Sequence, residues 1–335
     1  MNLGESLDSR FPVWIIPVTL PRRSHASHSL DTTDFASPQA RPSPAGLALV
    51  AGILPRPGTP MARPCFSRME LLIATLAVAI AVAVLIPTVQ KLRAASQRTR
   101  CIGNLQRIGV AFQSYHSANR KFPPGGNHAP NAASACVSGP GCREREWSWA
   151  YHILPHLGHE DVHRNPDASA VRAFPVPSYY CPSRRRPRCS NNLASIDYAA
   201  NAGTRPDGSN GVVLRSSLEP ISIWDIADGA ASTVLVAEKR LNVGELGTGP
   251  GDSEGYAAPG WTSEAYRLGT MPPAADVEAP GDLNAFSEFG SSHPGTLNAL
   301  FADGSVRTIR FTVNPAIWRR ACSRDDNQAF NLNDL

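Results

Sequence analysis

The sequence Leu71-Leu-Ile-Ala-Thr-Leu-Ala-Val-Ala-Ile-Ala-Val-Ala-Val-Leu-Ile86, followed directly by Pro87, contains sixteen residues and no charged side chain. As an α-helix it spans roughly 24 Å, a little less than the roughly 30 Å hydrocarbon core of a bilayer. Hydropathy alone therefore allows a membrane anchor, the core of a signal peptide or a helix buried in a protein core. Glu70 stands directly before the run. It is either a functional carboxylate or a side chain at headgroup level, near the favourable end of the helix dipole.

The helical pattern resumes after Pro87, because apolar side chains recur every three or four residues while most basic side chains lie off this stripe. The stripe consists of Val89, Leu92, Ala95, Thr99, Ile102, Leu105, Ile108, Phe112 and Tyr115. We expect one long helix over residues 69–119, kinked at Pro87, with a membrane segment at 71–86 and an amphipathic half beyond it. The amphipathic half should cover another part of the protein.

The composition indicates a mostly globular chain with many loops. The 335 residues are 42% hydrophobic, which is enough for one large or two ordinary domains. The 30 prolines and 26 glycines exclude a helical bundle throughout. The net charge is only +4. Three of the 32 basic residues are lysine, and this excess of arginine fits codon composition better than phosphate recognition, so a nucleic-acid partner is not expected.

The first sixty residues differ from the rest of the chain. Residues 1–60 hold nine of the 30 prolines and show no sustained apolar period, so we expect them to be disordered. Met61 stands shortly before the helix signal, and translation from it would make 1–60 an upstream extension that is not part of the protein. Residues 61–68 would then be a short basic leader.

Short strands are predicted in the C-terminal half. Ser232–Ala237 and Leu297–Phe301 are apolar or β-branched runs, and Ser305–Thr312 alternates between apolar and polar residues. Asp-Gly pairs at Asp228-Gly229 and Asp303-Gly304 are typical of turns with positive φ. We therefore expect a twisted antiparallel sheet with the amphipathic helix packed on it, which makes the fold class α+β.

Two close pairs stand out among the seven cysteines. Cys136 with Cys142, and Cys181 with Cys189, lie in loop-like sequence where short disulfide loops would form in an oxidising compartment. Free thiols are the alternative, and the spacing fits a zinc site poorly. The intervening Arg184-Arg185-Arg186-Pro187-Arg188 is expected to be a solvated basic loop, although it could also meet an anionic lipid or polysaccharide.

Few residue patterns indicate catalysis. His293 and Asp303 could meet across a hairpin, but neither a Gly-x-Ser-x-Gly elbow nor a His-Glu-x-x-His helix is present, so a packed histidine and a turn aspartate are expected. Asp303, Asp228 and Glu238 are candidate oxygen ligands for a hard cation such as Ca²⁺. We expect neither an enzyme nor a resident cofactor.

A second candidate metal site is a group of four histidines with offsets of four, three and four residues. The group consists of His152, His156, His159 and His163. An uninterrupted helix would align them on one face, where two imidazoles one turn apart share a zinc ion. Pro155 and Gly158 oppose such a helix, and an exposed polar face is the other interpretation.

The segment Cys65-Phe66-Ser67-Arg68-Met69-Glu70 resembles the Gly-Phe-Thr-Leu-x-Glu pattern of type IV prepilins and type II secretion pseudopilins. In that family a membrane peptidase cleaves before the Phe and methylates the new amine, and the Glu pairs with the amine of a neighbouring subunit. The resemblance implies cleavage after Cys65, N-terminal methylation of Phe66 and an assembly role for Glu70. Cys65 stands where the family has glycine, and Arg68 where it has an apolar residue.

The remainder resembles a large bacterial family of prepilin-like proteins of unknown function with an H-x9-DG motif. His293 is followed after nine intervening residues by Asp303-Gly304. Further matching segments are Cys101-Ile-Gly-Asn-Leu-Gln-Arg-Ile-Gly, Lys121-Phe122-Pro123-Pro124-Gly125, Cys181-Pro182-Ser183, Asp197-Tyr198, Ile226-Ala227-Asp228-Gly229 and Glu238. The resemblance implies a pilin-like architecture and supplies no biochemical activity.

Together these observations predict a single-pass protein of the bacterial inner membrane whose globular domain, residues 120–335, lies in the periplasm or at the cell surface. Its expected partners are the membrane, other pilin-like subunits of a pilus or secretion pseudopilus, and a prepilin peptidase. Basic residues follow the apolar run more often than they precede it, and the positive-inside rule alone would favour the opposite orientation. The alternative function is an exported, membrane-anchored ligand- or metal-binding module or a metal-dependent enzyme.

Overall fold

A computed structural model describes residues 67–127, 146–257, 259–278 and 287–335 of the chain. Residues Phe66–Leu335 form one compact unit. Several predictions concern residues outside the described ranges: disorder over 1–60, most of the leader at 61–68, the cleavage site at Cys65 and Phe66, and the pair Cys136 and Cys142.

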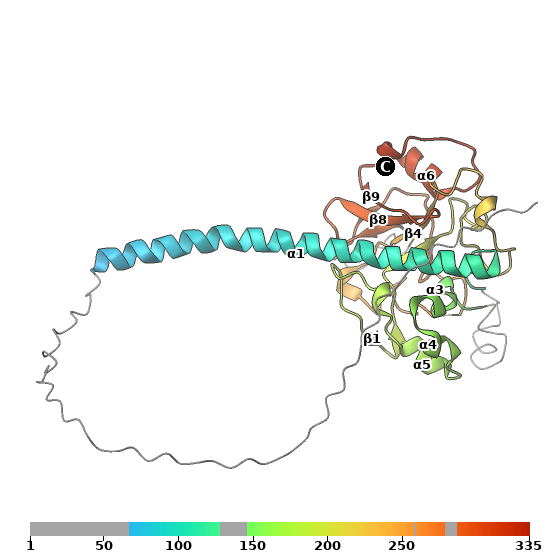
Figure 1. Ribbon diagram of the computed structural model, residues 1–335, viewed down its shortest axis with the longest axis horizontal. Coiled ribbons are helices and arrows are strands. Elements are labelled where there is room, and N and C mark those ends of the chain that lie inside the picture. The colour runs from blue at the N-terminus through green and yellow to red at the C-terminus, as the bar shows by residue number, and fades with distance from the viewer. Residues whose placement is uncertain (1–66, 128–145, 258, 279–286) are drawn as a thin grey trace, which may run out of the picture. The chain divides into compact units, whose positions relative to one another are not determined.

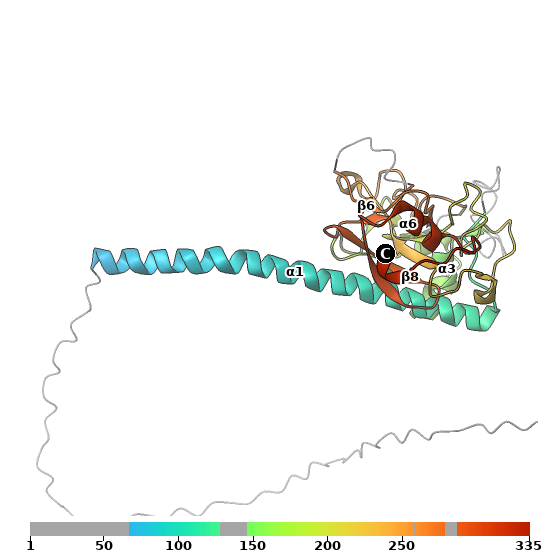
Figure 2. The ribbon, with the colours of Figure 1, turned by 90° about the horizontal axis from the view of Figure 1, so that it is seen from above.

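The predicted long helix is present as α1, Arg68–Asn119. Ser67 caps its first turn through a capping box, because its side chain accepts from the backbone of Glu70 while the Glu70 carboxylate accepts from the backbone of Ser67. The helix ends where Arg120 adopts a left-handed conformation with φ of 62°. It continues through Pro87 without interruption, and the helix as a whole is curved (Figures 1 and 2).

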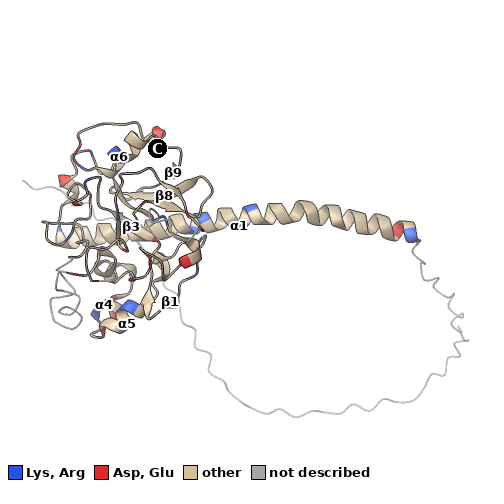
Figure 3. Ribbon diagram, turned by 180° about the vertical axis from the view of Figure 1, so that it is seen from behind, with Lys and Arg blue, Asp and Glu red and all other residues tan. Residues whose placement is uncertain are grey.

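The two halves of α1 have different environments. The apolar first half is exposed, with large hydrophobic side chains such as Leu72, Val78 and Leu85 more than half accessible. Charged side chains are absent between Glu70 and Lys91, as the tan stretch of α1 in Figure 3 shows. In the part of the chain that the structure describes, α1 is the one helix long and apolar enough to cross a membrane.

The globular part of the chain that follows the apolar half of α1 is called the body. A five-stranded sheet forms its centre, with strand order β5-β3-β4-β8-β9. The strands are β3 (Tyr198–Asn201), β4 (Val234–Glu238), β5 (Tyr266–Arg267), β8 (Thr296–Phe301) and β9 (Val306–Arg310). The three predicted strands correspond to β4, β8 and β9. The Asp303-Gly304 turn joins β8 to β9, and Gly304 has a φ of 88°. The sheet is mixed and not purely antiparallel, because the edge strand β5 runs parallel to β3.

Shorter elements surround the sheet. Two two-stranded ribbons pair β1 (Cys189–Ser190) with β2 (Leu193–Ala194) and β6 (Ala274–Ala275) with β7 (Gly290–Ser291). The helices are α3 (Trp149–His152), η1 (Pro155–Leu157), α4 (Glu160–Arg164), α5 (Ala168–Ala173), η2 (Pro177–Tyr179), η3 (Ile223–Asp225), η4 (Val243–Glu245), α6 (Pro315–Cys322) and η5 (Leu332–Asp334).

The second half of α1 packs on one face of the sheet and α6 on the other (Figure 1). Side chains of β8 alternate between these faces, so Leu300 joins the core under α1 while Leu297 and Phe301 join the core under α6. On α1, Leu105 and Phe112 are fully buried in the first core. The predicted amphipathic half of the helix therefore does cover the sheet.

Candidate functional site

A disulfide joins α1 to the body through Cys101 and Cys181, whose Cα atoms are 5.1 Å apart. The expected pairing of Cys181 with Cys189 is therefore wrong. Cys181 follows η2 and is turned into the core with 1% of its surface exposed, whereas Cys189 lies on the exposed β1 and is free. Burial against the helix decided the pairing, and closeness in sequence did not.

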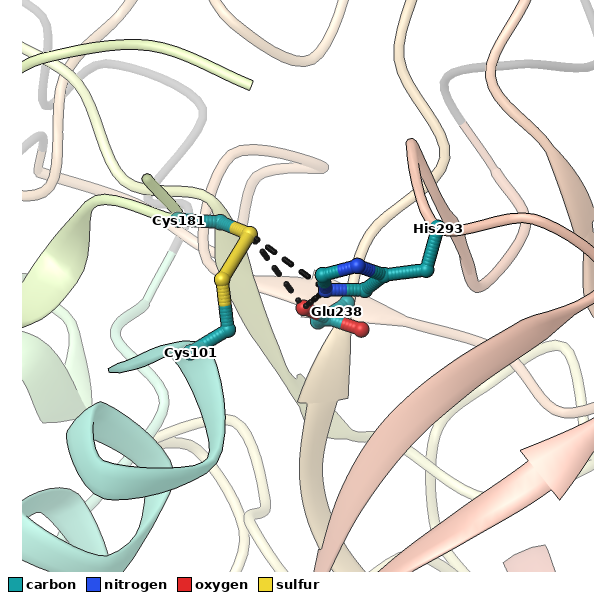
Figure 4. Close-up of side chains that lie close together, drawn as sticks. All are labelled: Cys101, Cys181, Glu238 and His293. Carbon is teal, nitrogen blue, oxygen red and sulfur yellow. Dashed lines mark hydrogen bonds and ion pairs between the residues drawn. A yellow bond between two sulfur atoms is a disulfide. The ribbon is translucent and has the colours of Figure 1, made fainter. Parts of the chain in front are cut away.

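A buried carboxylate and a buried imidazole lie against this disulfide (Figure 4). Glu238 ends β4, and His293 lies in the loop between β7 and β8. His293 Nε2 is 2.9 Å from Glu238 Oε1 and 3.6 Å from Cys181 Sγ, and Glu238 Oε1 is 3.4 Å from the same sulfur. We call Cys101, Cys181, Glu238 and His293 the sulfur cluster.

Neighbouring backbone and side-chain groups fix both polar members of the sulfur cluster. Asn298 donates to Glu238 Oε2 twice, from its backbone nitrogen at 2.7 Å and from Nδ2 at 3.2 Å. The Asn298 side chain is itself held by Thr308, whose Oγ1 donates to it at 3.1 Å. The backbone nitrogen of His293 donates to Ser291 Oγ at 2.9 Å. Glu238 Oε2 is thus occupied, while Oε1 is turned toward the imidazole and the sulfur.

The loop that follows Cys181 is held by buried ion pairs. Asp197 accepts from the backbone nitrogen of Cys181 at 2.8 Å and lies 2.7 Å from Arg185 and 3.3 Å from Arg184. Burial alone would raise the pKa of Asp197, but the two guanidinium groups lower it below its ordinary value. Arg184 also pairs with Asp276 at 2.9 Å. The expectation of a solvated basic loop is therefore wrong for Arg184 and Arg185.

Lys239, the residue after Glu238, is also fully buried. Its Nζ donates to the carbonyl of Gly251 at 2.7 Å and to the carbonyl and carboxylate of Glu264 at 3.1 and 3.3 Å. Burial lowers the pKa of Lys239 although the carboxylates of Glu264 and Asp252 oppose this shift. These contacts satisfy the ammonium group locally, so it stabilises the loops around it and does not point into the sulfur cluster.

The structure separates the residues of the predicted hard-cation site. Asp303 caps its own turn, where Oδ1 accepts from the backbone and hydroxyl of Ser305 at 2.8 and 2.7 Å. Asp228 accepts from the backbone nitrogens of Asp326 and Asn327. His293 is bonded to Glu238 and not to Asp303. Among the described residues, the sulfur cluster is the one group of three or more His, Cys, Asp or Glu whose ligand atoms converge.

The four histidines do not share one helical face, because they are distributed over and between α3, η1 and α4. Pro155 starts a separate 3-10 turn, and Gly158 ends it with φ of 84°. His152 is buried, and burial together with the nearby His163 lowers its pKa to about 4. His163 stacks on Tyr151 with ring centroids 4.5 Å apart. Among the described residues, these histidines form no group of three or more converging ligand atoms.

Comparison with known proteins gives a family. The family model described as a protein of unknown function (DUF1559) matches residues 90–316, from the second half of α1 into α6. No curated protein and no solved structure matches the chain significantly. The matched range contains the five-stranded sheet and every residue of the sulfur cluster.

Proposed function

The chain belongs to the DUF1559 family of proteins of unknown function, and we propose that it is a membrane-anchored, prepilin-like structural protein and not an enzyme. In this proposal the first half of α1 crosses the bacterial inner membrane and the body lies on the extracytoplasmic side. The protein is a subunit of a pilus or a secretion pseudopilus, and neighbouring copies meet through their helices.

One observation carries the proposal: a single helix has an exposed apolar half and a half that is part of the body. The 52 residues of α1 span about 78 Å, far more than a bilayer needs. None of the apolar segment of α1 is buried. Exposed apolar surface of this extent requires lipid or the helices of neighbouring subunits.

The disulfide supports an extracytoplasmic body. Disulfides persist in oxidising compartments such as the periplasm and are rare in the cytoplasm. The Cys101–Cys181 bond lies beyond the apolar half of α1, so it favours export of the body over the orientation suggested by Lys91, Arg93 and the other basic residues of the helix.

Glu70 is the residue through which the proposal is tested. In the isolated chain its carboxylate closes the capping box with Ser67. In an assembly the same carboxylate would pair with the N-terminal amine of a neighbouring subunit, because a carboxylate at the edge of a membrane needs a cationic partner. The two roles are separable, since glutamine also serves in a capping box but carries no charge.

The experiment places a photo-crosslinking residue at Val78 on the exposed half of α1 in the protein's own host. We expect crosslinks between copies or to another pilin-like subunit. Glu70→Ala and Glu70→Gln should each lower their yield at least about tenfold, while both proteins stay in the membrane fraction. Glu160→Gln, which removes an exposed carboxylate of the body, is the matched control. Unchanged crosslinking in Glu70→Gln would refute an assembly role for the charge.

A further inference from the structure

We infer that the sulfur cluster is a binding site for one borderline-soft divalent cation, with Zn²⁺ as the representative ion, in the reduced protein. The Cys101–Cys181 disulfide is then the oxidised, metal-free form of the same site. This inference concerns the body alone and does not depend on the role proposed for α1.

The donor set is the one that such an ion takes. Two cysteine thiolates, one imidazole nitrogen and one carboxylate oxygen give four ligands of the types found in tetrahedral zinc sites. The mixture of sulfur and nitrogen disfavours Ca²⁺ and Mg²⁺, which bind oxygen ligands almost exclusively. All four residues are at most 3% exposed, as expected of a closed structural site.

Two of the distances between ligand atoms already match a tetrahedral site. With metal–sulfur bonds of about 2.3 Å and metal–nitrogen or metal–oxygen bonds of about 2.0–2.2 Å, neighbouring ligand atoms lie about 3.3–3.8 Å apart. Cys181 Sγ is already 3.6 Å from His293 Nε2 and 3.4 Å from Glu238 Oε1. The four ligand atoms all lie within 4.8 Å of one another. A bound cation therefore requires the disulfide to open and the 2.9 Å contact between His293 Nε2 and Glu238 Oε1 to widen by a few tenths of an ångström.

The surroundings match a thiol or a metal better than a disulfide. A disulfide sulfur carries no hydrogen, so Cys181 donates nothing to Glu238 Oε1 in the oxidised state. In the reduced state its thiol can donate across the same 3.4 Å, and a cation can bind both atoms. Asn298 holds Oε2 from the other side, which is how second-shell groups orient a carboxylate ligand.

The ligands come from four separate parts of the chain. They lie on α1, in the segment after η2, at the end of β4 and in the loop before β8. A cation in the sulfur cluster would therefore cross-link the helix to the sheet, as the disulfide does. Either form fixes α1 to the body. Binding of the cation is coupled to folding because the four ligands come together only in the folded chain.

The conversion between the two forms is a two-electron exchange. A dithiol reductant gives two electrons and two protons to the disulfide, becomes a disulfide itself and leaves two thiols at Cys101 and Cys181. The divalent cation then replaces the two thiol protons, which leave to solvent, and binds the neutral imidazole of His293 and the carboxylate of Glu238. Oxidation of the two thiolates by another disulfide releases the cation.

The test uses the full chain in detergent. The protein is reduced with a phosphine, freed of reductant without oxygen and titrated with Co²⁺, whose thiolate complexes absorb in the near ultraviolet. We expect one equivalent of bound cobalt with thiolate-to-cobalt absorption in the reduced wild type, displaced by Zn²⁺, and no such band in the oxidised protein. Absence of the band in reduced protein that keeps its circular dichroism would overturn the inference.

Variants locate the site and X-ray absorption defines its ligands. Cys101→Ser should abolish the band, whereas Cys189→Ser, a change at an exposed free thiol, should leave it unchanged. Asn298→Ala should weaken binding about 10- to 100-fold and retain the band, because Asn298 positions Glu238 and does not bind the cation. Zinc-edge absorption of the reduced wild type needs no variant. Two sulfur and two nitrogen or oxygen ligands are expected, and a shell of oxygen alone contradicts the site.

Discussion

Removing the Cys101–Cys181 disulfide should destabilise the body by an amount that depends on the length of the loop that the disulfide closes. The two residues are 80 positions apart. A cross-link closing a loop of that length lowers the conformational entropy of the unfolded chain by an amount worth about 4.5 kcal/mol at 25 °C. The double variant Cys101→Ala and Cys181→Ala should lose most of this free energy of unfolding, because both sites are buried and alanine fits them without a new polar group.

The assay is guanidinium unfolding of the full chain in detergent with a metal chelator present, followed by fluorescence of the buried Trp147, Trp149 and Trp318. Cys189→Ala is the control, because it makes the same chemical change at an exposed free cysteine and should change stability by less than about 0.5 kcal/mol.

Chemically reduced wild type separates the cross-link from the loss of sulfur volume. It should lose about as much stability as the double variant if loop closure is the cause. A loss below about 1 kcal/mol in both proteins would refute the reasoning, since it would mean that the packing of α1 and the buried ion pairs hold the helix without the bond.

Two further predictions concern α1 and the histidine segment. Gly103→Ala should stabilise the body by up to about 1 kcal/mol in the same unfolding assay, because a Cβ there meets no atom within 4 Å. Gly109→Ala should stabilise it less or destabilise it, because the new Cβ would lie 2.7 Å from a Leu300 methyl group. Equal gains in stability would contradict the close packing of α1 on β8. Burial, with the nearby His163, lowers the pKa of His152 to about 4. Between pH 6.5 and 4 the unfolded chain therefore binds a proton that the folded chain does not. The free energy of unfolding should fall by about 3 kcal/mol as the pH drops through this range. His152→Gln should flatten that part of the profile, and an unchanged slope would assign the pH dependence to other groups.

Local patterns predicted the main elements of the fold. The apolar run and the stripe beyond Pro87 indicated one helix, and α1 spans Arg68–Asn119. Alternation and the Asp303-Gly304 turn predicted the hairpin of β8 and β9. The parallel edge strand was missed because β5 has only two residues, too few to carry a period. Its pairing with β3 depends on tertiary structure.

The candidate site was less accessible from the sequence, because its contacts join residues far apart in the chain. Cys101 lies near the apolar stripe of the helix, a signal of burial that could have identified it as the partner of Cys181. Glu238 and His293 were individually singled out, but their contact depends on the sheet register. Likewise, a run of arginines by itself indicates a solvated loop. The carboxylates that pair with these arginines, such as Asp197, are distant in the sequence and become neighbours only in the folded structure.

The most direct test of the proposed function is the intact mass and N-terminal sequence of the protein recovered from membranes of its own host. A mature chain that begins at N-methylated Phe66 is the predicted result, because it requires export, cleavage after Cys65 and methylation together. A membrane-bound protein that keeps Cys65 and begins at or before Met61 would contradict prepilin-like processing, and the chain would then be a simply anchored protein.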